Sequence, residues 1–218
     1  MPEIIPAILT NNPQELRDML LKLEGKVDRV QIDIIDCKFA NNRTIDPSAL
    51  ENIDTTLKLD YHLMTVNPVD WVERCVRGQA DRIIGQIERM NDQLEFVGKV
   101  QEVGLSVGLG LDLGSDVNDI DSAILLDLDV VLVMGTKAGF GGQKFNEDCL
   151  SVISKLSEIK QQDQSPFVVC VDGGETLEVE PRVIRAGADE IVVGRSLFDG
   201  NIEDNINKFH GKQSLTQN

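Results

Sequence analysis

The sequence is poor in basic residues. Its 218 residues include 21 lysines and arginines against 37 aspartates and glutamates, which gives a formal net charge of −16 and a pI near 4.4. Nucleic acids and anionic membrane surfaces are therefore poor partners for the chain as a whole. If the protein binds a small anion, the cations that hold it must be local.

Paired cysteines and long apolar runs are also missing. The four cysteines lie far apart in the sequence, at Cys37, Cys75, Cys149 and Cys170. This spacing argues against a zinc knuckle, a redox pair and a disulfide framework. No apolar run approaches the roughly 18 residues of a membrane span, and no basic region followed by an apolar core opens the chain. We therefore expect a cytoplasmic protein with no membrane partner.

What the sequence contains throughout is an alternation of short Val- and Ile-rich runs with helical patterns. The runs predict strands over residues 3–9, 29–35, 56–64, 80–87, 106–111, 129–134, 167–171 and 190–193. Eight strands, each followed by a helix, are what a closed (β/α)₈ TIM barrel needs and more than a flavodoxin-like sheet uses. We expect a single TIM-barrel domain over residues 1–209 and a polar C-terminal tail over residues 210–218.

Polar residues gather at the ends of the predicted strands, where TIM barrels carry their catalytic groups. Gln31 and Asp33 share one face of the second strand, His62 lies on the third, Asp172 ends the seventh, and Lys137 follows the sixth. Two opposed carboxylates suit removal of a proton from one face of a carbon and its delivery to the other. A histidine beside them is either a buried core residue or a ligand for a divalent cation.

Three glycine-rich turns follow the last three predicted strands. They contain Gly139, Phe140, Gly141 and Gly142, then Gly173 and Gly174, then Gly194 and Arg195. Any one of them could be only a tight connection, but together they occupy the region where this fold commonly binds phosphate through backbone N–H groups. Arg195 either adds a fixed positive charge to this phosphate site or forms a surface salt bridge.

Several motifs in these segments resemble those of the ribulose-phosphate 3-epimerase family, in order from residue 4 to about residue 199. The motifs are Ile5-Pro6-Ala7-Ile8-Leu9, Asp60-Tyr61-His62-Leu63-Met64 followed by Asn67-Pro68, Leu132-Val133-Met134, Gly139-Phe140-Gly141-Gly142-Gln143-Lys144-Phe145, Val171-Asp172-Gly173-Gly174 and Ala186-Gly187-Ala188-Asp189. The glycine block together with His62-Leu63-Met64 makes the resemblance specific for the family.

The resemblance implies an isomerase that epimerises ribulose 5-phosphate to xylulose 5-phosphate, or a related ketose phosphate, through an enediolate. It implies that Asp33 and Asp172 are the acid–base pair, and that these aspartates and His62 bind a divalent cation. It also places His62 among the substrate-binding residues and assigns the phosphate to the three glycine turns and Arg195.

The chain departs from the family pattern at several of these positions. Gln31 stands where the family has its first metal-binding histidine, Ala7 replaces a substrate-binding serine, and Gln86 replaces a histidine on strand four. An amide oxygen is a weaker ligand than imidazole. We therefore expect a divalent cation (Zn, Mn, Mg or Fe), with Gln31 as a weak fourth ligand, to be bound weakly or not at all.

Two alternatives to the epimerase stay open on the sequence. One is a lyase or another phosphosugar enzyme on the same barrel, for which Lys137 would be a Schiff-base nucleophile if it were desolvated. The other is a degenerate relative that binds a phosphosugar without turning it over, which Gln31 and Ala7 suggest. In each case the partner is a small phosphosugar, and a homo-oligomer is possible.

Overall fold

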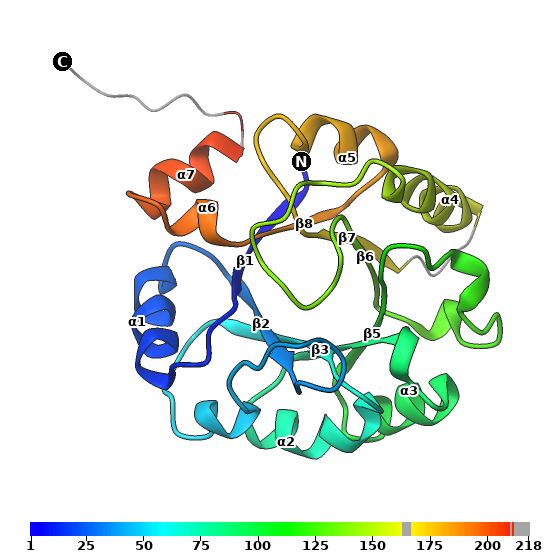
Figure 1. Cartoon of the computed structure of the whole chain (residues 1–218), viewed down its shortest axis with the longest axis horizontal. Helices are drawn as coiled ribbons and strands as arrows, with labels where there is room; N and C mark the ends of the chain where they lie inside the picture. Colours follow the sequence, from blue (N-terminus) through cyan, green and yellow to red (C-terminus); the bar gives the residue numbers. More distant parts are fainter. Residues whose placement is uncertain (163–166, 210, 212–218) are drawn as a thin grey trace.

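The chain folds into a closed barrel of eight parallel strands in sequential order, as Figure 1 shows for this computed structural model. The structure describes residues 1–162, 167–209 and 211, so most of the predicted polar tail lies outside the described residues. The strands are β1 (Glu3–Ile8), β2 (Arg29–Ile35), β3 (Lys58–Met64), β4 (Arg82–Gln86), β5 (Ser106–Leu111), β6 (Val130–Met134), β7 (Val168–Asp172) and β8 (Glu190–Val193). The predicted TIM barrel is confirmed.

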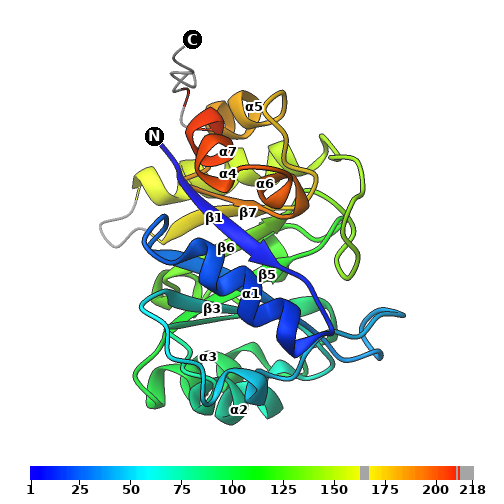
Figure 2. The same cartoon turned by 90° about the vertical axis from the view of Figure 1, so that its left-hand side faces the viewer.

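Helices surround this barrel. The α-helices in the described residues are α1 (Pro13–Leu23), α2 (Val72–Arg77), α3 (Gln93–Glu102), α4 (Cys149–Gln162), α5 (Glu180–Ala186), α6 (Arg195–Phe198) and α7 (Ile202–Phe209). α1 begins where its sequence predicts, because the Asn12 side chain accepts hydrogen bonds from the backbone N–H groups of Gln14 and Glu15. Its buried Leu16, Leu20 and Leu23 pack along the barrel beside β1 (Figure 2).

Two of the helices expected between strands are short 3₁₀ turns. Between β2 and β3 the chain has only a 3₁₀ turn (Pro47–Leu50), and between β5 and β6 only two (Val117–Asp119 and Leu125–Asp127). In the second case the Asp116 side chain accepts from the N–H of Asn118, and the Asp119 side chain accepts from the N–H of Asp116. These two contacts form a capping box that fixes the N-terminus of the turn, and the backbone is extended again at Ile120, so the turn ends after Asp119.

The interior of the barrel is filled by inward-pointing side chains of alternate residues. At the N-terminal end of the strands, Arg82 of β4 donates to Glu190 of β8 at 2.7 and 3.0 Å and to Asp60 of β3 at 2.5 Å. Arg29 also pairs with Asp60. This ionic cluster closes one end of the barrel, so a ligand can reach the interior only from the other end.

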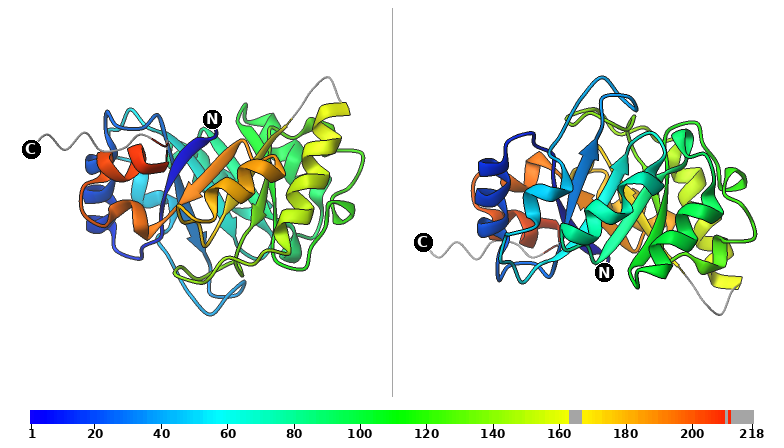
Figure 3. Two further views of the ribbon diagram at one scale, coloured as in Figure 1. Left: turned by 90° about the horizontal axis from the view of Figure 1, so that it is seen from above. Right: turned by 90° about the horizontal axis from the view of Figure 1, so that it is seen from below.

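At the open end, long connections follow β2 and β6. Figure 3 shows both loops projecting from the same end of the barrel. They touch each other, because the Asn42 side-chain amide donates to the Gly139 carbonyl at 2.9 Å. In the part of the chain that the structure describes, no helix combines the length and the apolar character needed to cross a membrane.

Candidate active site

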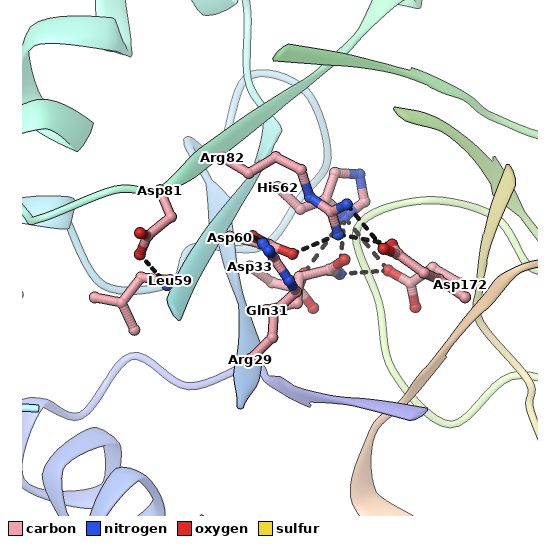
Figure 4. A network of polar contacts seen from close by, with 10 residues as sticks. Arg29, Gln31, Asp33, Leu59, Asp60, His62, Asp81, Arg82 and Asp172 are labelled. Carbon is pink, nitrogen blue, oxygen red and sulfur yellow. Dashed lines mark hydrogen bonds and ion pairs between the residues drawn. The ribbon is translucent and has the colours of Figure 1, made fainter. Parts of the chain in front are cut away.

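Three of the predicted residues meet inside the open end of the barrel. Asp33 comes from β2, His62 from β3 and Asp172 from the end of β7, and one ligand atom from each lies within 4.8 Å of the other two (Figure 4). His62 Nδ1 is 3.3 Å from Asp33 Oδ1 and 3.4 Å from Asp172 Oδ2. All three residues are buried. The period-2 alternation of β2 and β3 places these side chains on the inner face, as expected.

Gln31 belongs to the same cluster. Its side-chain nitrogen Nε2 donates to Asp33 Oδ1 at 2.9 Å and to Asp172 Oδ2 at 2.7 Å, and it lies 3.3 Å from His62 Nδ1. The amide therefore holds the two carboxylates together from the inner side. In this orientation Gln31 offers hydrogen-bond donors and no lone pair.

Gln86 contacts the opposite nitrogen of His62. Its amide is oriented so that Nε2 donates to the Gly110 carbonyl at 2.7 Å and to Glu88 Oε2 at 3.0 Å, while its oxygen accepts from His62 Nε2 at 3.1 Å. Because the Gly110 carbonyl and Glu88 Oε2 both accept hydrogen bonds, the amide nitrogen of Gln86 is assigned to the side that faces them. His62 thus carries a proton on Nε2 and presents Nδ1 to the carboxylates. The sequence singled out Gln86 as the replacement of a histidine on strand four, but its contact with His62 was not predicted.

The cluster shifts the acidity of its members. Burial raises the pKa of Asp33, the hydrogen bond from His62 partly offsets this, and the nearby charge of Asp172 raises it further. Burial by itself would lower the pKa of His62, but hydrogen bonds and charge from Asp172 and Asp33 raise it to about 9. The two carboxylates therefore favour the charged form of His62.

Asp33, His62 and Asp172 also fit a divalent cation. Two carboxylate oxygens and one imidazole nitrogen that converge from three strands are a usual partial ligand set for Zn, Mn or Fe. The hydrogen bond from His62 Nε2 to Gln86 is the second contact that a metal-binding histidine normally makes. Gln31 does not complete the set in the orientation seen, because its nitrogen faces the other three residues.

The three glycine turns converge on one pocket of about 990 Å³ beside the carboxylates. Its lining includes Asp33, Asp172 and the predicted phosphate-binding residues Gly139, Phe140, Gly141, Gly142, Gly173, Gly174, Gly194 and Arg195. Gly142 has a left-handed φ of +77°, and a methyl group on it would overlap the guanidinium of Arg195. The turn after β6 and the start of α6 are therefore in direct contact.

Arg195 forms no salt bridge among the described residues, so its charge is available to an anion. Thr136, which the sequence did not single out, lines the same pocket and packs against Gly173. The apolar part of the pocket wall is formed by Ala7, Met64 and Met134. The pocket thus contains two carboxylates, those of Asp33 and Asp172, together with the positively charged guanidinium of Arg195.

Three predicted residues, Gln31, His62 and Lys137, do not line this pocket. His62 is fully buried behind the carboxylates, and a substrate would meet it only through them. Lys137 is exposed and is not part of the pocket lining, whereas Met134 and Thr136 are. The desolvation that a Schiff-base lysine needs is absent at this position.

Comparison with known proteins places the chain in a family. The profile of the ribulose-phosphate 3 epimerase family matches residues 3–198. The ribulose-phosphate 3-epimerase of Bacillus subtilis (strain 168) is 32% identical over 205 residues, covering 91% of this chain and 93% of that protein. The enzyme of the same name from Treponema pallidum (strain Nichols) is 31% identical over 202 residues, covering 91% and 92%.

Solved structures confirm the architecture. A 3-hexulose-6-phosphate synthase superposes with a TM-score of 0.70 at 15% identity, covering 97% of this chain and all of that one. The 3-keto-L-gulonate-6-phosphate decarboxylase of Vibrio cholerae has the same TM-score at 12% identity, covering 96% of each chain. At such low identity the likeness concerns the fold alone. The sequence matches, the closed barrel and the cluster of Asp33, His62 and Asp172 together show that the chain belongs to the ribulose-phosphate 3 epimerase family.

Proposed function

We propose that the protein epimerises a phosphorylated ketose, ribulose 5-phosphate and xylulose 5-phosphate or a close relative, at the carbon next to the carbonyl. Asp33 and Asp172 exchange the proton through an enediolate. The observation that carries the proposal is that both carboxylates line the pocket that also contains the glycine turns and Arg195.

The hydrogen bonds of the two carboxylates leave one oxygen of each for chemistry. Gln31 and His62 approach Oδ1 of Asp33 and Oδ2 of Asp172. Oδ2 of Asp33 and Oδ1 of Asp172 have no side-chain partner among the described residues. A substrate carbon between these oxygens would lose its proton to one carboxyl group and receive a proton from the other on its opposite face. The raised pKa of Asp33 suits a carboxyl group that must both accept and donate a proton.

The phosphate of the substrate would lie against the backbone N–H groups of the glycine turns, with Arg195 as its counter-charge. A cation held by Asp33, His62 and Asp172 would supply positive charge that stabilises the enediolate. Gln86 keeps His62 Nδ1 turned toward the carboxylates whether or not a cation is bound.

Proton exchange with solvent tests the acid–base assignment. Wild-type protein should exchange the substrate proton for deuterium from D₂O with both epimers of the active ketose phosphate. Asp33→Asn and Asp172→Asn should each abolish epimerisation, and each should retain exchange with at most one epimer, because the remaining carboxylate reaches only one face. Asp127→Asn, on a 3₁₀ turn outside the pocket, is the control. Undiminished exchange with both epimers in Asp172→Asn would refute the assignment.

A binding protein without turnover is the second candidate, and the contact of Gln31 with both carboxylates favours it. Saturable binding of the ketose phosphate by the wild-type protein, without any exchange in D₂O, would establish it. The lyase alternative is not proposed, because Lys137 is exposed outside the pocket. A cytoplasmic location and a homo-oligomer stay predictions, for which cell fractionation and sedimentation are the measurements.

A further inference from the structure

We propose that Gln31 competes with a divalent cation for the acid pair and is not one of its ligands. The inference concerns cation binding without substrate, so it does not rest on the epimerase activity.

The position of the Gln31 nitrogen is the first part of the argument. Nε2 lies 2.9 Å from Asp33 Oδ1, 2.7 Å from Asp172 Oδ2 and 3.3 Å from His62 Nδ1. These three atoms belong to the three residues whose ligand atoms converge to within 4.8 Å of one another and could hold a cation. A point in contact with all three is where a shared cation would lie, and the amide nitrogen already occupies it.

The orientation of the amide is the second part. If its oxygen pointed inward instead, it would face two carboxylate oxygens and be repelled by both. The NH₂ group donates one N–H to each carboxylate, and hydrogen bonds to ionised acceptors are roughly twice as strong as neutral ones. Gln31 is 1% exposed, so water does not compete for these bonds. The two N–H groups thus stabilise the carboxylates of Asp33 and Asp172 at the atoms that a cation would otherwise contact.

Binding a cation therefore requires the Gln31 amide to leave the carboxylates. Its hydrogen bonds are lost at that step, and the affinity of the cluster for the cation is lower by their free energy. Replacing Gln31 with leucine removes both donors while keeping a side chain of similar size. It should raise the affinity for a cation at least tenfold.

The opposite outcome defines the competing hypothesis. If Gln31 turns over and binds the cation through its oxygen, leucine removes a ligand and the affinity falls. The sign of the change in Gln31→Leu therefore separates the two roles.

The experiment is calorimetric titration of the whole chain, freed of metal with a chelator, with Mn²⁺ and with Zn²⁺ in the absence of substrate. Gln31→Leu and Gln31→Ala should both bind more tightly than wild type. Gln101→Leu, whose side chain on α3 is exposed and donates only to the Asp127 carbonyl, should match wild type. His62→Ala should lose binding, which locates the cation at the cluster. Unchanged or weaker binding in the Gln31 variants, or binding by none of the proteins, would overturn the proposal.

A second measurement needs no variant that might fold poorly. In ¹⁵N NMR spectra of wild-type protein, the side-chain NH₂ signals of Gln31 should show protected protons without a cation. They should shift and lose that protection when diamagnetic Zn²⁺ saturates the site. Signals that stay protected at saturation would show that the amide never leaves the carboxylates and would contradict competition. The cation affinity and the Gln31 NMR signals are both measured without substrate. A negative deuterium-exchange test would therefore refute the proposed epimerase activity without affecting the proposed competition between Gln31 and the cation.

Discussion

At the scale of single residues, alanine substitutions at Gly142 and Gly114 distinguish the effect of backbone strain from the effect of contact with Arg195. Gly142 and Gly114 have left-handed φ angles of +77° and +94°, so alanine strains the backbone at either position by about 1 kcal/mol. Only at Gly142 does the added methyl group overlap the Arg195 guanidinium, whereas the space around Gly114 is open.

Gly142→Ala should therefore raise KM for the ketose phosphate about tenfold, because the displaced Arg195 no longer pairs with the phosphate; this factor corresponds to about 1.4 kcal/mol. Gly114→Ala should leave KM unchanged. It should lower the free energy of unfolding by about as much as Gly142→Ala does, because the backbone strain is similar in the two variants. Steady-state kinetics and urea unfolding of both variants check this. Equal KM values in the two variants would exclude a contribution of Arg195 to phosphate binding.

Glu175 follows the second glycine turn and makes the stability depend on pH. Both of its carboxyl oxygens are buried without a hydrogen-bond partner among the described residues. Burial raises the pKa of Glu175 to about 9, and the nearby Asp172 carboxylate adds to the effect. In the unfolded chain the group loses its proton near pH 4.3. Its contribution to stability is therefore full below that pH and falls as the pH rises toward 9.

Glu175→Gln keeps the shape and removes this titration. The variant should match wild type near pH 4.5 and become more stable than wild type as the pH increases, by at most about 1.4 kcal/mol per pH unit. Urea unfolding at pH 5, 6.5 and 8 measures the difference. A difference that stays constant over this range would mean that Glu175 ionises in the folded protein as it does in water.

At the scale of elements, Arg82 ties β4 to β8 across the barrel. It bonds Glu190 and Asp60, and all three side chains are nearly fully buried. Arg82→Met should lower the free energy of unfolding by about 3–5 kcal/mol, because two buried carboxylates lose their counter-charge. Arg77→Met, which breaks an exposed pair with Glu51, should cost less than about 1 kcal/mol. Similar costs in chemical denaturation would show that the buried cluster does not hold the barrel closed.

The strands were predictable because their apolar runs and inward polar residues follow the simple period of a β-strand. That period placed Asp33 and His62 on the inner face, and the glycine turns, predicted to bind phosphate, line the same pocket as Asp33. The missing α-helix between β5 and β6 was not predictable in the same way. Its segment has apolar residues in helical spacing, but each of its two 3₁₀ turns ends where the backbone becomes extended, at Ile120 and at Leu128.

At the scale of the whole molecule, the features that sequence reasoning missed depend on contacts between distant strands. Gln31 was predicted as a weak ligand, whereas its nitrogen faces acids on β2 and β7, which only the closed barrel brings together. Lys137 was predicted as a nucleophile only if it were desolvated, and in the assembled barrel it is exposed. A residue type and a strand position can be predicted locally, while the direction of a flexible amide in a polar cluster cannot.

The contact between the loops after β2 and β6 also exists only in the assembled barrel. β2 and β6 lie on opposite sides of the barrel, and the hydrogen bond from Asn42 to the Gly139 carbonyl spans its open end (Figure 1). Because this bond holds the phosphate-binding turn in place, Asn42→Ala should raise KM for the ketose phosphate and speed amide hydrogen exchange over residues 138–145.

Asn118→Ala is the control, since the side chain of Asn118 bonds only Asp116 in its own turn, outside the pocket. It should leave both KM and the exchange over residues 138–145 unchanged. Without the bond from Asn42, the turn samples open conformations more often, and each opening separates its N–H groups from a bound phosphate. Saturating inorganic phosphate should therefore slow this exchange in both Asn42→Ala and wild type, with a larger effect in the variant. Exchange that is equal in wild type and Asn42→Ala would show that the turn is held by its own glycine geometry and its contact with Arg195.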